Sequence, residues 1–249
     1  SDWQLTGVGL QFPPGTVLLP QRYAVAVKND PAFRAAYPGG RQVLGGYSSA
    51  PGTSGGTIEL RMPDGVLIDS VHYDDEAPWP TSPDGGGPSL ELIDPTRDNA
   101  RVGNWAASLA PGGTPALENS LAGMFADLPA VWINEVLADN ASVNVDESGD
   151  RDAWIELYNA GAAIVDLGGF RLSDDPAMPD KWALPAGTSL APGGWLLIWV
   201  DGEPGEGPLH TSFALPATGG VVVLSDSALA LVDTLRVGEL PADTAFGRY

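Results

Sequence analysis

Short apolar runs, bounded by glycine, proline and aspartate, recur along the whole chain. In residues 57–61 apolar and polar side chains alternate, which places both aliphatic side chains on one face of an extended strand. Runs of this kind are typical of β-strands, and the Pro-x-Gly-Thr units between them predict turns. One helical turn is expected at residues 30–36, with Asp30 as its cap and Pro31 in its first position. Many short strands separated by turns predict a β-sandwich or barrel rather than βαβ units.

The same order of segments occurs twice along the chain. Residues 12–20 and 184–192 each lead from an apolar residue through proline to Gly-Thr and end in proline. An apolar strand that begins with an aromatic residue follows each of them, at residues 23–27 and 195–200. The other matching pairs are residues 3–6 with 170–173, 56–60 with 220–224, and 66–71 with 230–235. Because the order is kept in both halves, we interpret the chain as two copies of one all-β unit.

These segments resemble the bacterial lamin-tail domain (LTD) family. The second copy carries the fuller pattern, in residues 133–136, 154–159, 165–175, 181–182 and 184–188. The first copy carries the later part, in residues 12–16, 79–80, 84–92, 105–108 and 113–115. The resemblance implies an all-β fold of two immunoglobulin-like β-sandwich domains in tandem, and it implies no catalytic chemistry.

We therefore expect a first lamin-tail-like domain in residues 1–120, a connector in 121–130 and a second domain in 131–249. The first copy lacks counterparts of the strands at 133–136 and 154–159, and the second ends before the final strand that the first one keeps. A sandwich without these strands has open edges. We expect residues outside this chain, a partner or the second unit to complete the first domain by strand complementation. The opening residues already read as a strand, so we expect the sequence to begin inside a larger protein.

Charge and composition narrow the possible functions. Twelve Lys and Arg against 32 Asp and Glu give a formal net charge of −20, which repels phosphate backbones and argues against nucleic-acid binding. The absence of cysteine excludes disulfides, thiol catalysis and zinc sites built on thiolates. No apolar run approaches the roughly 20 residues that span a bilayer. The acidic surface serves solubility alone, or it offers carboxylate oxygens to hard cations such as Ca²⁺.

The densest group of acidic residues lies in residues 139–152. Oxygen-bearing side chains alternate there with glycine and small residues, a composition that lets a loop wrap around a hard cation. The spacing does not fit an EF-hand, and the flanks read as strands. Ca²⁺ is therefore a candidate cofactor, with Asp139, Asn144, Asp146, Asp150, Asp152 and Asp174 as candidate ligands. The alternative is a solvated acidic turn held by Asx-type hydrogen bonds.

Two further patterns bear on catalysis. Glu135 and Glu156, on adjacent predicted strands, have the residue types of a glycosidase acid and base, or they belong to a polar sheet face. Residues 52–56 look like the nucleophile motif of trypsin-like proteases, but neither His72 nor His210 has the sequence context of the required base. The resemblance favours the polar-face interpretation, and we expect the protein not to be an enzyme.

The remaining aromatic and histidine residues allow two interpretations. Trp182, Trp195 and Trp199 suit a carbohydrate-stacking platform or a sandwich core, and the core is favoured. Trp195 and Trp199 share parity along one strand and therefore the same face. The two histidines are interpreted as ordinary surface or edge residues.

The expected function is that of a non-catalytic extracellular binding or structural module of an exported bacterial protein, secreted or at the cell surface. Rigid sandwiches would present loops and sheet edges to a protein or glycan partner. One alternative is an accessory segment of a larger secreted hydrolase or nuclease, with the active site elsewhere. The other alternative is a glycoside hydrolase in its own right.

Overall fold

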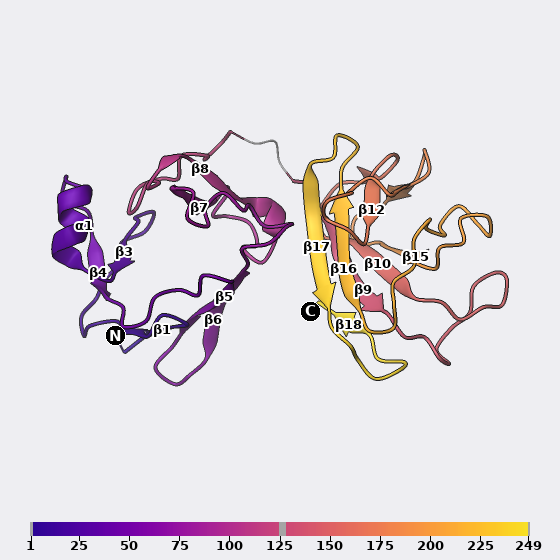
Figure 1. Cartoon of the computed structure of the whole chain (residues 1–249), viewed down its shortest axis with the longest axis horizontal. Coiled ribbons are helices and arrows are strands. Elements are labelled where there is room, and N and C mark those ends of the chain that lie inside the picture. Colours follow the sequence, from indigo (N-terminus) through magenta and orange to yellow (C-terminus); the bar gives the residue numbers. More distant parts are fainter. Residues whose placement is uncertain (1, 125–127, 249) are drawn as a thin grey trace. The chain divides into compact units, whose positions relative to one another are not determined.

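The computed structural model describes residues 2–124 and 128–248, which divide into two compact units (Figure 1). Unit 1 comprises residues 1–100 and 104–126, and unit 2 comprises residues 101–103 and 127–249. Strands dominate both units, which confirms the predicted all-β fold class. The predicted connector at residues 121–130 includes residues 125–127, which lie outside the described residues. In the described part of the chain, no helix has the length and apolar character needed to cross a membrane.

Unit 1 is built on one four-stranded antiparallel sheet and two separate strand pairs. The sheet has the order β2-β1-β5-β6, and its strands are β1 (Gln4–Thr6), β2 (Leu10–Gln11), β5 (Gly56–Arg61) and β6 (Leu67–Tyr73). The other two pairs are parallel β3 (Val25–Val27) with β4 (Val43–Gly46), and antiparallel β7 (Pro88–Leu92) with β8 (Trp105–Pro111). A 3₁₀ turn, η1 (Val102–Asn104), precedes β8.

Unit 2 is a sandwich of two four-stranded sheets. One sheet has the order β15-β10-β9-β18, formed by β9 (Val131–Leu137), β10 (Trp154–Asn159), β15 (Trp195–Trp199) and β18 (Phe246–Gly247). The other has the order β13-β12-β16-β17, formed by β12 (Arg171–Ser173), β13 (Trp182–Ala183), β16 (Gly220–Ser225) and β17 (Leu231–Val237). Strands β11 (Val165–Asp166) and β14 (Ser189–Leu190) form a small additional pair. One cluster of buried aliphatic residues, including Ile133, Ile155, Leu172 and Leu224, joins the two large sheets.

The segments of units 1 and 2 that match in sequence also match in their strand pairing. The ladder of β5 with β6 places Leu60 opposite Asp69, and the ladder of β16 with β17 places Leu224 opposite Asp233. Each ladder shifts register immediately after its leucine. In addition, β1 pairs with β5 as β12 pairs with β16. The four-stranded sheet of unit 1 therefore has the same strand order and the same irregularity as one sheet of unit 2.

Asp233 connects the two sheets of unit 2. Its carboxylate is completely buried and accepts a hydrogen bond of 2.8 Å from the backbone N–H of Ile133 on β9. The Arg248 guanidinium donates to the same carboxylate at 2.6 Å. Since β17 and β9 belong to different sheets, this acid holds one side of the sandwich closed.

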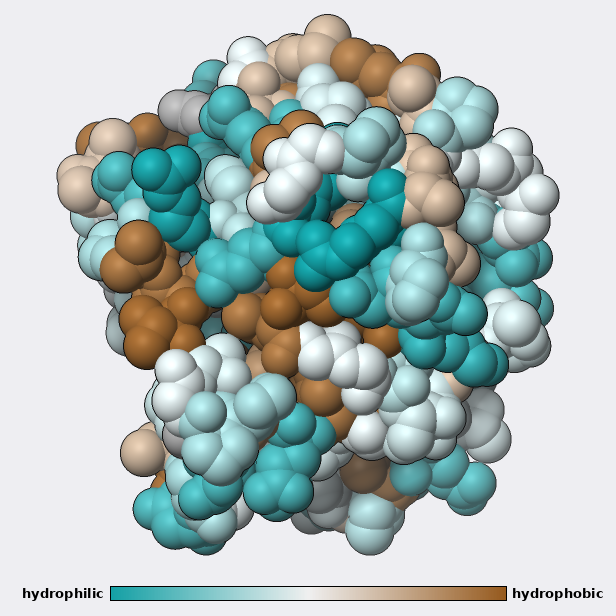
Figure 2. Space-filling model, turned by 90° about the vertical axis from the view of Figure 1, so that its left-hand side faces the viewer, coloured by the Kyte–Doolittle hydropathy of each residue, from teal (hydrophilic) through white to brown (hydrophobic). Residues whose placement is uncertain are grey.

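Unit 1 buries fewer apolar side chains than unit 2. Val66, Leu67 and Ile68, at the start of β6, are 51%, 47% and 48% exposed. Both hydrophobic clusters formed by buried residues of the described chain lie in unit 2. On the face drawn in Figure 2, hydrophobic surface gathers in brown patches within the teal polar surface. The surrounding strands therefore bury the apolar side chains at the start of β6 only in part.

The predicted helix is confirmed as α1 (Asp30–Ala36), but the predicted cap is wrong. Asn29 is the N-cap, because its side-chain oxygen accepts from the backbone N–H of Ala32 at 3.0 Å. Asp30 instead lies in the first turn, where it pairs with Arg34 at 2.8 Å. An acid in the first turn and a base in the last complement the helix dipole.

Glu91 on β7 anchors the loop that follows β8. The residue is only 4% exposed, and its carboxylate accepts hydrogen bonds from the backbone N–H and the hydroxyl of both Thr114 and Ser120, at 2.6 to 3.1 Å. Burial alone would raise the pKa of Glu91, but these four donors outweigh burial and hold the pKa below its ordinary value. The carboxylate is therefore bound in its charged form.

We expect Glu91→Gln to lower the free energy of unfolding at pH 7 by about 2 kcal/mol, the usual size for hydrogen bonds to a charged group. Because the folded pKa is lowered, this stabilisation is present above the unfolded pKa of about 4.3 and is lost as the pH falls through the folded pKa. Urea titrations at several pH values measure the effect, with the exposed Glu118→Gln as control. An equal loss at acidic and neutral pH would contradict this account.

Arg248→Met should destabilise unit 2 by about 3 kcal/mol, because it leaves the Asp233 carboxylate buried without its charge partner. The exposed Arg236→Met, on the same strand as Asp233, serves as the control. Denaturant unfolding followed by circular dichroism measures both variants. Adding Asp233→Asn to Arg248→Met should restore part of the loss, and a double variant no more stable than the single one would argue against a buried ion pair.

Candidate cation centre

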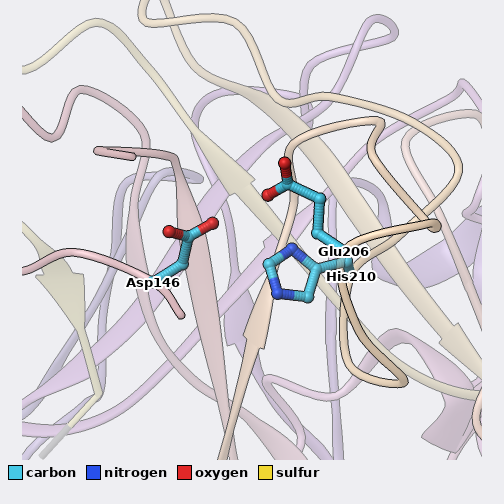
Figure 3. Close-up of side chains that lie close together, drawn as sticks. All are labelled: Asp146, Glu206 and His210. Carbon is cyan, nitrogen blue, oxygen red and sulfur yellow. The ribbon is translucent and has the colours of Figure 1, made fainter. Parts of the chain in front are cut away.

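Two loops of unit 2 bring acidic side chains together beside the sheet β15-β10-β9-β18. The loop between β9 and β10 supplies Asp146 and Asp152, and the segment after β15 supplies the other members. The first group is Asp146, Glu206 and His210, and the second is Asp152, Asp201 and Glu203. Within each group the potential ligand atoms lie within 4.8 Å of one another. Figure 3 shows the first group, with its side chains from the two loops around one space.

A tight turn fixes the orientation of Asp146. Its Oδ1 accepts hydrogen bonds from the backbone N–H groups of Ser148, Gly149 and Asp150 at 2.9, 2.7 and 2.8 Å. Gly149 has a φ of +93°, a conformation that glycine adopts without a steric penalty. The turn therefore uses one carboxylate oxygen for structure and leaves the other directed at the cluster, as Figure 3 shows.

The second oxygen of Asp146 is buried without a hydrogen-bond partner among the described residues, and so is Oδ2 of Asp152. Asp146 as a whole is only 8% exposed. A buried acceptor left unpaired costs about 1–3 kcal/mol, and more when it is charged. The two oxygens belong to different groups, so a cation in one group would satisfy only the oxygen of that group.

His210 is buried beside these acids, which corrects its interpretation as a surface or edge residue. It is 1% exposed, and its ring stacks on Trp199 with 6.3 Å between ring centroids. Nδ1 lies 2.5 Å from Asp201 Oδ2, and Nε2 lies 3.2 Å from Glu147 Oε2. Burial lowers the pKa of His210, but the hydrogen bonds to the two carboxylates outweigh burial and raise the pKa above its ordinary value. A carboxylate on one ring nitrogen is also the arrangement that orients metal-binding histidines.

Repulsion between the acids is visible in the pKa of Asp152. Burial raises this pKa most, and the negative charges of Asp201 and Asp146 raise it further. The pKa of Glu206 is also raised: the Ser148 hydrogen bond lowers it, but burial and Asp146 together outweigh that bond. Burial raises the pKa of Asp146 as well, but backbone hydrogen bonds and a hydrogen bond with Glu206 outweigh burial and lower it. The unfavourable ionisation therefore falls on Asp152 and Glu206, and a divalent cation beside them would relieve it.

The six predicted ligands fall into two classes. Asp146 and Asp152 belong to the two groups just described. The other four have different environments. Asn144 Oδ1 accepts from Trp154 Nε1, and Asp150 donates its backbone N–H to Asp146. The carbonyl of Asp139 accepts from Asp243 N–H, and the Asp174 carboxylate pairs with Lys181 at 2.7 Å.

Sequence reasoning missed Asp201, Glu203, Glu206 and His210 as candidate ligands. They lie far from residues 139–152 in the sequence, and only the pairing of β15 with β10 brings the two loops together. The one available signal was the acidic, glycine-rich composition of residues 201–207, which resembles that of the first loop.

The two sequence patterns considered for catalysis lie on a sheet face and in the turn before a strand. Glu135 and Glu156 lie directly opposite each other on β9 and β10, and Asn134 donates to Glu156 at 2.8 Å. Burial, and then the charge of Glu156, raises the pKa of Glu135. Residues 52–56 lead into β5, which begins at Gly56.

The three tryptophans expected in the core have different exposures. Trp182 is partly buried and packs against the main core. Trp199 is 7% exposed, but it lies in a small separate cluster with Leu137 and Trp154 and not in the core between the sheets. Trp195 is 60% exposed, so its assignment to the core is wrong. Its ring stacks on Tyr158 of the neighbouring strand, with 5.3 Å between centroids. Because β15 is an edge strand, this end of its outer face is left uncovered.

Residues 126–239 match the family model of the Lamin Tail Domain. This range contains strands β9 to β17, and hence the sandwich and both acidic loops. The family is non-catalytic and immunoglobulin-like, so the match supports the β-sandwich fold for this part of the chain. No curated protein matches the sequence.

Asp152→Asn should stabilise the protein in the absence of divalent cations. The folded pKa of Asp152 is raised, so its ionisation opposes folding, and stability falls as the pH rises through its unfolded and folded pKa values. We expect a gain on the order of 1 kcal/mol in EDTA at pH 7, an ordinary single-site effect. Denaturant titration measures it, with the exposed Glu239→Gln as control. A loss of stability in EDTA would show that Asp152 has a favourable partner.

Proposed function

We propose that this chain is a non-catalytic binding or structural module of an exported bacterial protein, secreted or at the cell surface, with acidic loops held by a divalent cation. The match to a non-catalytic domain family and the sandwich fold support the first part. The single observation that carries the second part is the buried Oδ2 of Asp152, which has no hydrogen-bond partner among the described residues and lies in a group with Asp201 and Glu203, where two acidic loops converge.

The donor atoms indicate which cation each group would take. Asp152, Asp201 and Glu203 offer only carboxylate oxygens, the ligands that Ca²⁺ prefers, and backbone carbonyls or water would complete the coordination. Asp146, Glu206 and His210 include an imidazole, a ligand that suits Zn²⁺ and similar metals, but both ring nitrogens already have carboxylate partners in Asp201 and Glu147. We assign Ca²⁺ to the all-oxygen group.

Cation binding would serve recognition through rigidity. A divalent ion would tie the β9–β10 loop to the segment after β15 and reduce the repulsion among their acids. Loops on a rigid scaffold are the usual place for binding residues. In a larger secreted hydrolase or nuclease, such a module would position the enzyme on its target.

Strand uptake by unit 1 belongs to the same proposal. The half-exposed apolar residues Val66, Leu67 and Ile68 of unit 1 offer a surface to a partner. A binding module can recognise a polypeptide by adding its strands to an exposed sheet, in which main-chain hydrogen bonds supply affinity.

A thermal melt with Ca²⁺, Mg²⁺, Zn²⁺ or EDTA tests the cation centre. At 100 times its Kd, Ca²⁺ stabilises by about 2.7 kcal/mol, which corresponds to a Tm increase on the order of 5 °C for a protein of this size. We expect Asp201→Asn and Asp152→Asn to remove most of this shift, because each removes a charge from the all-oxygen group.

Asp174→Asn is the matched control, since Asp174 pairs with Lys181 and belongs to neither group. It should keep the full calcium shift. An unchanged Tm with all three cations would contradict the proposed role, and a shift that survives both Asp201→Asn and Asp152→Asn would place the cation elsewhere.

A further inference from the structure

Two flanks of unit 1 correspond to positions that strands occupy in unit 2. We propose that these flanks form a docking site for a pair of antiparallel β-strands supplied by another polypeptide segment, in the manner of β9 and β10. The inference rests on the proposed function as a binding module and names the chemical class of its partner.

The first flank is β6, which corresponds to β17 residue for residue. Val232 on β17 is completely buried, whereas Ile68 at the equivalent position of β6 is 48% exposed. Asp233 reaches the backbone N–H of Ile133 on β9. Its counterpart Asp69 is exposed and accepts from the side-chain amide of Asn99 at 2.9 Å instead. The difference between the two positions is that β9 lies against β17 in unit 2, whereas β6 has no such strand beside it in the described part of unit 1.

The second flank is β3, which corresponds to β15. Each of the two strands follows a Pro-x-Gly-Thr turn. Each also has a parallel neighbour on one side: β3 pairs with β4, and Trp199 of β15 forms a parallel bridge with His210. On its other side β15 pairs with β10 over five residues, from Trp154↔Trp199 to Tyr158↔Trp195. Within the described residues of unit 1, β3 pairs only with β4, so its second edge retains unused backbone groups.

The open edge of β3 lies beside a groove that could accommodate an added strand. A cavity of about 310 Å³ is lined by Tyr23, Ala24 and Val25 on one side and by Ser89 to Glu91 of β7 on the other. Tyr23, the counterpart of Trp195 in the repeat, is 43% exposed. An edge with unpaired backbone groups and exposed apolar side chains is a template for strand addition.

These features define the occupant. The incoming strands must be extended, antiparallel to each other and apolar at alternate positions, as β9 and β10 are. One strand pairs with β3 through main-chain hydrogen bonds, and the other brings a backbone N–H to Asp69, as Ile133 does to Asp233. The net charge of −20 favours a segment that is not itself strongly acidic. A glycan or a nucleic acid does not supply this ladder of N–H and C=O groups.

Hydrogen exchange of the whole chain provides the first measurement. Amides of β3 and β6 should exchange faster than those of β15 and β17, by at least about tenfold, since local opening is easier where contacts are missing. Equal protection of corresponding strands would show that unit 1 is already closed, and would overturn the inference.

Strand uptake is the second measurement. The probe is a synthetic peptide that joins β9 (residues 131–137) to β10 (residues 154–159) through a short Gly-Ser linker, which replaces the acidic loop between the two strands. It should slow exchange in residues 23–27 and 66–71 by about tenfold or more. The control peptide carries Ile133→Asp and Ile155→Asp, which place charges at two buried positions. Ile68→Asp in the protein should abolish uptake, whereas Leu109→Asp, at an exposed position of β8, should not.

Protection by the control peptide, or no protection by the intact one, would overturn the inference. Self-association that protects β3 and β6, detected by sedimentation, would replace the proposed partner by a second copy of this chain and so overturn the choice of occupant. The calcium melt is independent, because it concerns loops of unit 2. If calcium raises the Tm but the peptide is not taken up, only the strand-docking inference is wrong. If the peptide is taken up but calcium leaves the Tm unchanged, only the proposed cation centre is wrong.

Discussion

The hydrogen bond from the Ile133 N–H to the buried Asp233 carboxylate is the constraint on which the sandwich of unit 2 depends. It joins strands of two different sheets, and Arg248 balances the buried charge. A carboxylate in an apolar interior is tolerated only with such partners. Once β9 is fixed in this way, β10 and β15 follow it in the same sheet, and the loops that carry the acidic residues start from fixed ends. Closure of the core and placement of the two acidic loops thus depend on the same strand.

The acidic end of unit 2 departs from the rule that buried polar atoms are paired. The turn at Asp146 satisfies three backbone N–H groups with one oxygen, and the other oxygen has no hydrogen-bond donor in the part of the chain that the structure describes, unless Glu206 carries a proton. Such a departure is usual where a protein binds something, because the missing partner is then the ligand. The adjoining strand β10 pairs with both β9 and β15, so the unpaired carboxylate oxygens lie in the loops and not in the sheet.

The sequence was sufficient for the strands and insufficient for the contacts between loops. Alternation and turn residues located β5, β6, β16 and β17, because a two-residue period and Pro-x-Gly-Thr units are local signals. Asp146 and Asp152 were found because they lie within one acidic run. His210 and Glu206 were not found, since their role depends on how two distant loops converge. The core assignment of Trp195 was wrong for another reason. The two-residue period of a strand shows which side chains share a face, but whether that face is buried depends on the elements that pack on it.

The stacking of Trp199 on His210 couples an indole to the cation centre. The ring planes are tilted by only 27°, and the indole is almost completely shielded from water. Emission from a shielded indole depends on the charge and dipoles beside it, and an imidazole that gains a proton or a metal changes both. If the proposed cation binds beside His210, the fluorescence of Trp199 should change, and the emission of a variant that lacks Trp199 would separate this indole from the other seven tryptophans.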